Sequence, residues 1–77
     1  MKGVIQMRLG EKVLKLRKKI NISQEQLGEQ VGVTRQTIIS IEQGRYIASL
    51  PLALKISKVF DLPVESVFML EEEDFNE

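Results

Sequence analysis

The sequence contains no cysteine and no histidine, and only four of its 77 residues are aromatic. The missing cysteines exclude disulfides, thiolate metal ligands and a cysteine nucleophile, and the missing histidines remove the most common general base and metal ligand. Because the sequence also lacks a glycine-rich phosphate loop, we expect no metal, no cofactor and no enzymatic activity. The core must consist mainly of Leu, Ile and Val.

Long apolar runs are missing as well. The longest one, residues 67–70, is far too short to cross a membrane, and residues 1–7 are too short to form a signal peptide. A chain of 77 residues, 43% of them hydrophobic, can bury one small core. We therefore expect a soluble, cytoplasmic protein with one domain.

The formal net charge is zero, but the charges are distributed unevenly along the chain. Residues 1–58 contain all 11 basic residues and four acidic ones, a net charge of +7, whereas residues 59–77 contain seven acidic residues and no basic one. A basic body is typical of a nucleic-acid-binding surface, although an ordinary helical surface can show it too. Residues 71–77 are acidic and polar apart from Phe75, which predicts a solvated, disordered tail.

Apolar residues at helical spacing predict a first helix over about residues 10–20. Val13, Leu16 and Ile20 share one face of this helix, and good helix formers lie between them. Asn21 tolerates the left-handed conformation that ends many helices, so it marks the end of the first helix.

Capping residues and glycines define two short helices in the centre of the chain. Ser23, followed three residues later by glutamine, is a capping box and predicts a second helix over residues 24–31. Thr34 is the N-cap of a third helix over residues 35–43. Only three residues separate these helices, which suits the near-perpendicular crossing of a helix-turn-helix. The residues expected to face inward are Leu27, Gly28, Val31, Ile38 and Ile41.

Two further helices complete the predicted all-α, five-helix bundle. A fourth helix starts at Ser49 and Pro51 and ends near Phe60, and a short fifth helix covers residues 64–68. The residues of the fourth helix expected to face inward are Leu50, Ala53, Leu54 and Ser57.

The two ends of the bundle allow alternatives. Residues 4–9 partly alternate between apolar and polar, so they could pair with residues 67–70 as a short antiparallel β-ribbon. They could equally extend the first helix or fray.

Three residues inside the predicted helices indicate contacts between them. Gly28 costs about 1 kcal/mol relative to Ala in a helix, so it suggests that another backbone passes close by. Arg17 and Glu42 each lie on the apolar face of their helix, and buried charges need partners. We expect these two side chains to form an ion pair between the third helix and the first, the alternative being that both reach water.

The outward face of the third helix suits DNA. It contains no carboxylate, and its residue types can hydrogen-bond or pack against base edges in the major groove. The residues on this face are Arg35, Gln36, Ile39, Ser40 and Gln43. Gln24, Thr34 and Arg45 flank the helix and could donate to phosphates.

The segment SQEQLGEQVGVTRQTIISIEQG, residues 23–44, resembles the helix-turn-helix of phage-repressor-type transcriptional regulators, the Cro-like or Xre-like family. The similarity extends over residues 13–68. It departs from the family pattern at Gly28, where Ala is more usual, and at Ile47-Ala48, where Asn-Pro is usual.

The resemblance implies a compact five-helix fold of the phage-repressor DNA-binding type and a set of site residues. The residues expected to contact bases are Arg35, Gln36, Ile39 and Ser40. The residues expected at phosphates, or positioning the helix, are Gln24, Thr34, Thr37, Arg45 and Tyr46. Arg17 and Glu42 match the structural ion pair of the family.

These observations predict a small transcriptional regulator, a repressor, that binds double-stranded DNA sequence-specifically with the helix at 35–43 in the major groove. We expect a DNA-binding domain over residues 10–70, with its helix-turn-helix at 24–43, between an N-terminal extension at 1–9 and the acidic tail at 71–77. Family members usually bind pseudo-palindromic operators as homodimers, and no membrane or small-molecule partner is indicated. Residues left over for a dimer interface are Ile5, Met7, Ile47, Val64 and Met69, and the alternative for each is that it completes the core of the monomer. The alternative is a protein-interaction module of the same fold, such as a repressor antagonist or an antitoxin-like protein.

Overall fold

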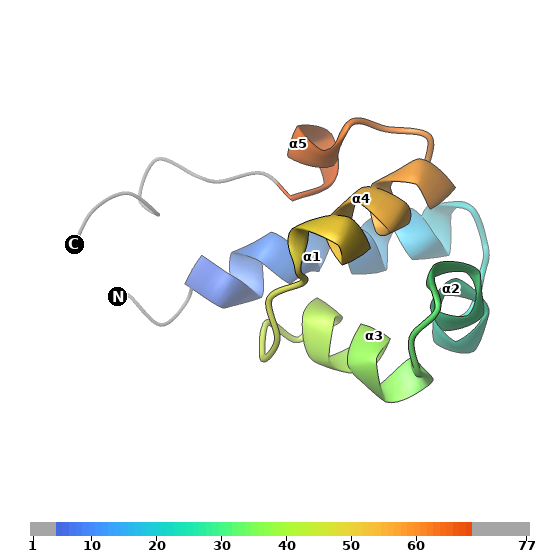
Figure 1. Ribbon diagram of the computed structural model, residues 1–77, viewed down its shortest axis with the longest axis horizontal. Helices are drawn as coiled ribbons and strands as arrows, with labels where there is room; N and C mark the ends of the chain where they lie inside the picture. The colour runs from blue at the N-terminus through green and yellow to red at the C-terminus, as the bar shows by residue number, and fades with distance from the viewer. Residues whose placement is uncertain (1–4, 69–77) are drawn as a thin grey trace.

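The computed structural model describes residues 5–68, which form five α-helices and no β-strand (Figure 1). The helices are α1 (Ile5–Lys19), α2 (Gln24–Val31), α3 (Arg35–Glu42), α4 (Leu50–Val59) and α5 (Val64–Val67). α2 packs on α3 and α4, and α1 packs on α3 and α5. The predicted all-α fold is confirmed. Within the described residues, no helix is both long enough and apolar enough to cross a membrane.

The first helix begins five residues earlier than predicted. α1 starts at Ile5, so residues 5–9 extend the first helix and do not form the strand of a β-ribbon. A helix satisfies most of its backbone N–H and C=O groups internally, whereas an isolated two-stranded ribbon is only marginally stable in water. The other residues of the predicted ribbon, 4 and 69–70, lie outside the described residues, as does the predicted tail at 71–77.

The predicted caps are present at the starts of α2, α3 and α4. The Ser23 hydroxyl accepts a hydrogen bond from the Gln26 N–H at 3.0 Å, and the Gln26 side-chain oxygen accepts one from the Ser23 N–H at 2.7 Å. Thr34 and Ser49 accept from the N–H groups three residues further on. Asn21 has a φ of 63°, the left-handed conformation predicted there. These caps stabilise helices that are too short to persist alone.

Six fully buried aliphatic side chains form the centre of the core, and all five helices contribute to it. They are Val13, Leu27, Ile38, Ile41, Ile56 and Val67. Phe60 and Phe68 are half-buried and pack against this cluster from its edge. The predicted inward positions of α2 and α3 are confirmed.

Three residues that were predicted to face inward, two in α4 and one at the end of the first helix, are exposed. Leu50 and Leu54 are 66% and 49% exposed, and Ile20, which follows the end of α1, is 46% exposed. The residues of α4 that are buried are Leu52, Ala53, Ile56 and Ser57. Both candidate faces of α4 contain Ala53 and Ser57, so periodicity alone does not separate them, and packing selects the face with Ile56.

Two glycines allow close approach between backbone segments. A Cβ atom on Gly28 would lie 2.7 Å from the carbonyl oxygen of Val33, which confirms the close approach predicted there. Gly10 is buried in α1, and a Cβ atom at this position would collide with the carbonyl oxygen of Ile41 in α3. Periodicity does not reveal this second contact, because a glycine adds nothing to an apolar stripe.

We expect Gly10→Ala to destabilise the domain, although Ala is the better helix former by about 1 kcal/mol. The added methyl group must displace the backbone of α3, and overpacking of this kind costs about 1–3 kcal/mol. Urea unfolding followed by circular dichroism measures the change. Glu11→Ala, at an exposed position of the same helix, is the control and should change stability by less than about 0.5 kcal/mol. A G10A variant as stable as the native chain would show that α1 and α3 do not meet here.

Candidate nucleic-acid interface

A tight turn sets α2 and α3 across each other. Gly32 adopts a left-handed conformation with a φ of 81°, and the N–H groups of Gly32 and Val33 both donate to the Gly28 carbonyl oxygen, at 2.8 and 2.9 Å. Thr34 then caps α3, and its hydroxyl oxygen lies 3.2 Å from that of Thr37. In Figure 1, α2 is seen almost end-on, whereas α3 runs across the lower side of the molecule. The pair has the geometry of a helix-turn-helix.

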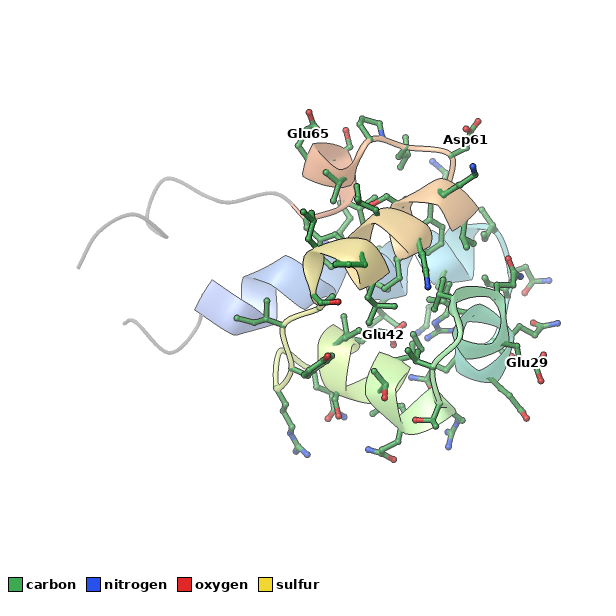
Figure 2. All side chains as sticks on the ribbon, in the orientation of Figure 1. Glu29, Glu42, Asp61 and Glu65 are labelled. Atoms are coloured by element: carbon green, nitrogen blue, oxygen red, sulfur yellow. The ribbon has the colours of Figure 1, made fainter. Side chains whose placement is uncertain are left out.

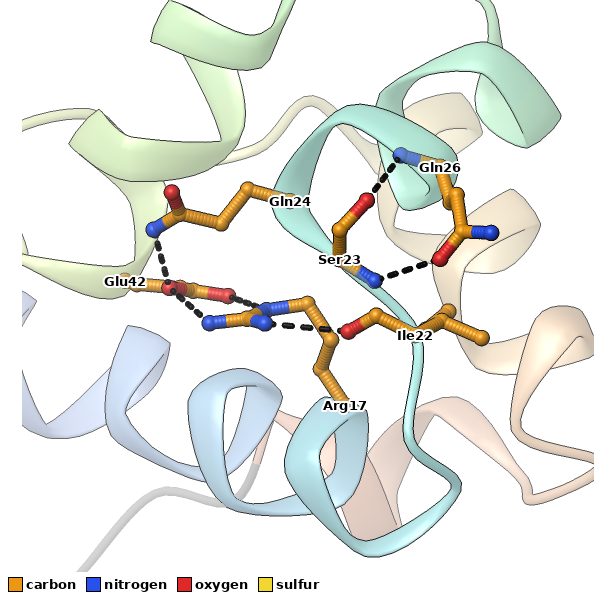
Figure 3. A network of polar contacts seen from close by, with 6 residues as sticks. All are labelled: Arg17, Ile22, Ser23, Gln24, Gln26 and Glu42. Carbon is orange, nitrogen blue, oxygen red and sulfur yellow. Dashed lines mark hydrogen bonds and ion pairs between the residues drawn. The ribbon is translucent and has the colours of Figure 1, made fainter.

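A buried ion pair connects the end of α3 to α1 (Figure 3). Arg17 Nε donates to Oε2 of Glu42 at 2.8 Å, and Arg17 Nη2 donates to Oε1 at 3.3 Å. Arg17 Nη1 also donates to the carbonyl oxygen of Ile22 at 3.0 Å. The Arg17 and Glu42 side chains are only 10% and 4% exposed. The predicted ion pair is confirmed, and neither side chain extends into water.

Gln24, the first residue of α2, joins the same network. Its Nε2 donates to Oε1 of Glu42 at 3.1 Å, so the carboxylate accepts hydrogen bonds from α1 and from α2 (Figure 3). From the sequence, Gln24 was expected at phosphates only, because a polar residue at a helix start gives no sign of an inward partner. The three donated hydrogen bonds satisfy the buried charge of Glu42. We call Arg17, Glu42 and Gln24 the Glu42 network.

The outward side of α3 presents polar groups and no acidic side chain. Glu42, the only acidic residue of α3, turns toward the interior (Figure 2). The predicted residues on the outward side divide into the exposed Arg35, Gln36 and Gln43 and the half-buried Ile39 and Ser40. This side of α3 therefore offers donors and acceptors to a ligand without repelling an anion.

Five of the predicted site residues border one shallow hollow beside α3. The hollow lies between the turn before α3, α3 itself and the loop that follows α3. Its lining consists of Val33, Thr34, Gln36, Thr37, Ser40 and Tyr46. Arg45 is exposed next to Tyr46, and its backbone N–H donates to the carbonyl oxygen of Ser40 at 2.9 Å. The loop after α3 is thereby connected to the helix.

Comparison with known proteins identifies the class of protein that this geometry defines. Residues 13–67 match the family model described as Helix-turn-helix. An uncharacterized HTH-type transcriptional regulator of Bacillus subtilis, YgzD, is 59% identical over 63 residues, which covers 82% of this chain and 96% of the relative.

Two solved structures show the same fold. The restriction-modification controller protein C.AhdI from Aeromonas hydrophila superposes with a TM-score of 0.79 at 26% identity, covering 86% of this chain and 96% of that protein. The P22 c2 repressor, solved in complex with a synthetic operator, superposes with a TM-score of 0.76 at 28% identity, covering 79% of this chain and 92% of the repressor.

The fold and the turn define a helix-turn-helix protein. More specifically, the chain belongs to the family of phage-repressor-type, Xre-like helix-turn-helix transcriptional regulators. This family is a class of DNA-binding proteins and not of enzymes. The family match extends from Val13 in α1 to Val67 at the end of α5, so it includes residues of all five helices.

Arg17→Met should destabilise the domain by on the order of 3 kcal/mol, because it leaves the buried carboxylate of Glu42 without its main partner. The double variant R17M/E42L also removes the carboxylate, so it should recover much of this loss. Chemical denaturation of the native chain, the double variant and both single variants, R17M and E42L, gives the coupling free energy. Strictly additive effects of the single substitutions would contradict a direct interaction in solution.

Proposed function

We propose that the protein is a sequence-specific regulator of transcription that binds double-stranded DNA with α3 in the major groove. The observation that carries this proposal is the outward side of α3, which presents hydrogen-bonding side chains and no carboxylate, because Glu42 is enclosed in the Glu42 network. The major groove admits an α-helix and presents a distinct pattern of donors and acceptors for each base pair. The capped turn and the Glu42 network hold the two ends of α3, so the helix meets DNA in one orientation.

Four side chains of α3 contact bases in this proposal. Arg35 suits O6 and N7 of guanine, and Gln36 suits N6 and N7 of adenine, in each case through two hydrogen bonds. Both residues are exposed at the N-terminal end of α3. Ser40 can hydrogen-bond either base edge and Ile39 can contact a thymine methyl group, and both are half-buried, so they need close entry of the helix.

Five residues around α3 position it on the sugar-phosphate backbone. They are Gln24, Thr34, Thr37, Arg45 and Tyr46. Gln24 uses one amide N–H for Glu42 and has a second one to offer a phosphate. Thr34 and Thr37 border the same hollow as Tyr46, and the exposed Arg45 is next to Tyr46 in the chain, which suits one stretch of backbone that passes beside α3.

The protein acts as a cytoplasmic repressor that occupies an operator and excludes other proteins from it. The superposition with a repressor solved on a synthetic operator supports DNA binding by this fold. The DNA-binding domain comprises residues 10–70, between an N-terminal extension at 1–9 and an acidic tail at 71–77.

Arg35→Ala and Gln36→Ala should each relax base preference at one position of the site, at a cost of about 1–3 kcal/mol in discrimination. A duplex selected from a random pool provides the cognate site, and anisotropy titrations compare it with duplexes that carry single mismatches. Gln30→Ala, at an exposed position of α2, is the control and should leave discrimination unchanged. Both variants should retain native stability, because their side chains are exposed.

Unchanged discrimination in both variants would exclude α3 as the element that contacts bases. The same titrations at two salt concentrations test DNA binding itself, because contacts to phosphates give an affinity that falls steeply with salt. A chain that binds no duplex at low salt would support the alternative, a protein-interaction module of the same fold.

We also propose that the protein binds a pseudo-palindromic operator as a homodimer. Four exposed apolar side chains and the half-buried Val64 form what we call the α4–α5 patch: Ile47, Leu50, Leu54, Leu62 and Val64. Val64 borders a hollow with Ile47 and Leu50 on one side and a hollow with Leu54 and Leu62 on the other, so the patch is continuous. An exposed apolar patch of this kind is typical of a protein interface. Two-fold pairing through it lets two copies of α3 reach half-sites about 34 Å apart.

Leu54→Ser should weaken dimerisation at least about tenfold, the effect expected from losing about 1.4 kcal/mol of apolar burial at the interface. Sedimentation equilibrium measures the association constant. Ile20→Ser is the matched control, because Ile20 is 46% exposed and Leu54 is 49% exposed, but Ile20 lies outside the patch. Equal effects of L54S and I20S would place the interface elsewhere.

A further inference from the structure

Most exposed basic residues of the described chain lie outside the proposed DNA-contacting surface. α3 and the loop after it contribute Arg35 and Arg45 to that surface. By contrast, α1 carries four exposed lysines: Lys12, Lys15, Lys18 and Lys19. The only acidic residue of α1 is Glu11. The strong positive charge of the body is therefore concentrated on a helix to which the proposed function assigns no ligand.

Three of these lysines form a continuous stripe along α1. Lys12, Lys15 and Lys19 follow one another at spacings of three and four residues, which places them on one side of a helix. We call them the α1 lysine stripe. Gly10 and Arg17 face α3, and the stripe lies on the opposite side of α1 because successive residues are about 100° apart. The stripe points away from DNA that is bound to α3.

Local helix energetics do not account for the whole stripe. Basic residues in the last turn complement the helix dipole, which explains Lys18 and Lys19. Lys12 and Lys15 lie earlier in α1. Glu11, four residues before Lys15, can compensate that lysine, but Lys12 has no acidic residue three or four positions away, and like charges at these spacings destabilise a helix. A row of this kind is stabilised when an anionic group binds to it.

We propose that the acidic segment of the same chain, residues 71–77, binds the α1 lysine stripe. This segment contains five acidic residues: Glu71, Glu72, Glu73, Asp74 and Glu77. Its five negative charges are opposite in sign to the three positive charges of the stripe, and the connection between the two makes the encounter intramolecular. The interaction does not require DNA binding, so an experiment can refute it without refuting the proposed function.

The described chain ends beside α1, on the side of this helix that faces α3. α5 packs on α1, and Phe68 lines the same hollow of about 280 Å³ as Gly10, so the segment must pass around α1 to reach the stripe. The nine residues that follow Phe68 can span at most about 30 Å. The stripe extends only about 10 Å along α1 from Lys12 to Lys19. A helix with its side chains is about 10–12 Å across, so the segment is long enough to pass around α1. Its distal acidic residues can reach the stripe, and binding there holds them away from α3.

Paramagnetic relaxation measurements test this contact in the full chain. The protein has no cysteine, so Asn76→Cys provides a single site for a nitroxide label and leaves all five acidic residues in place. We expect the label to broaden the amide signals around Lys12, Lys15 and Lys19 at least twofold more than those of α3. Raising the salt concentration from about 0.02 M to about 0.5 M should remove most of this difference, because the Debye length becomes shorter than the separation of unpaired charges.

Charge variants distinguish attraction from simple proximity. In the N76C background, K12Q/K15Q/K19Q should reduce the broadening of α1 at least twofold, whereas K55Q/K58Q, which removes two exposed lysines of α4, should not. Broadening that is insensitive to salt and to K12Q/K15Q/K19Q, or that centres on α3, would overturn the proposal. So would a loss of DNA affinity and of its salt dependence in K12Q/K15Q/K19Q beyond that in K55Q/K58Q, because the stripe would then bind phosphates.

Discussion

The arrangement of the first three helices depends on one carboxylate, that of Glu42. It lies at the end of α3, accepts two hydrogen bonds from Arg17 of α1 and accepts a third from Gln24 at the start of α2. Burying this charge costs free energy, and a well-packed apolar pair could stabilise the fold as well. The ion pair also fixes the orientation of α3 relative to α1, because a guanidinium that donates two hydrogen bonds to one carboxylate favours a single relative orientation of the two groups. The angle at which α3 leaves the body is set in this way.

The same interaction shapes the surface of α3. An eight-residue helix has little room to separate an inner from an outer side, and an exposed glutamate on it would face the phosphates of any DNA nearby. Enclosing Glu42 between α1 and α2 removes that repulsion and leaves the exposed Arg35, Gln36 and Gln43 on the outward side of the helix-turn-helix. Stability of the bundle and suitability of α3 for an anionic ligand thus come from one set of contacts.

Sequence patterns predicted those parts of the molecule that depend on local signals. The bounds of α2 and α3 follow from capping side chains and stop glycines, and the Arg17–Glu42 pair follows from two charges on apolar stripes. The predicted inner face of α4 was right at Ala53 and Ser57 and wrong at Leu50 and Leu54. Leucines at alternate positions give two candidate faces, and only the packing of the other helices selects between them. The contact at Gly10 and the role of Gln24 in the network gave no signal, since each depends on an atom brought close by a distant part of the chain. The contacts with bases and phosphates stay predictions.

The two contacts between α1 and α3 lie seven residues apart in α1, at Gly10 and Arg17. Seven residues make about two helical turns, so both positions face α3 only while the number of residues between them is kept. Inserting or deleting one residue in this interval would turn Arg17 about 100° away from Glu42, or bring a side chain against the Ile41 carbonyl in place of Gly10. We therefore expect insertions and deletions among related sequences to be rare in this part of α1. They should occur in the loop between α3 and α4, where this sequence departs from the family pattern at Ile47 and Ala48.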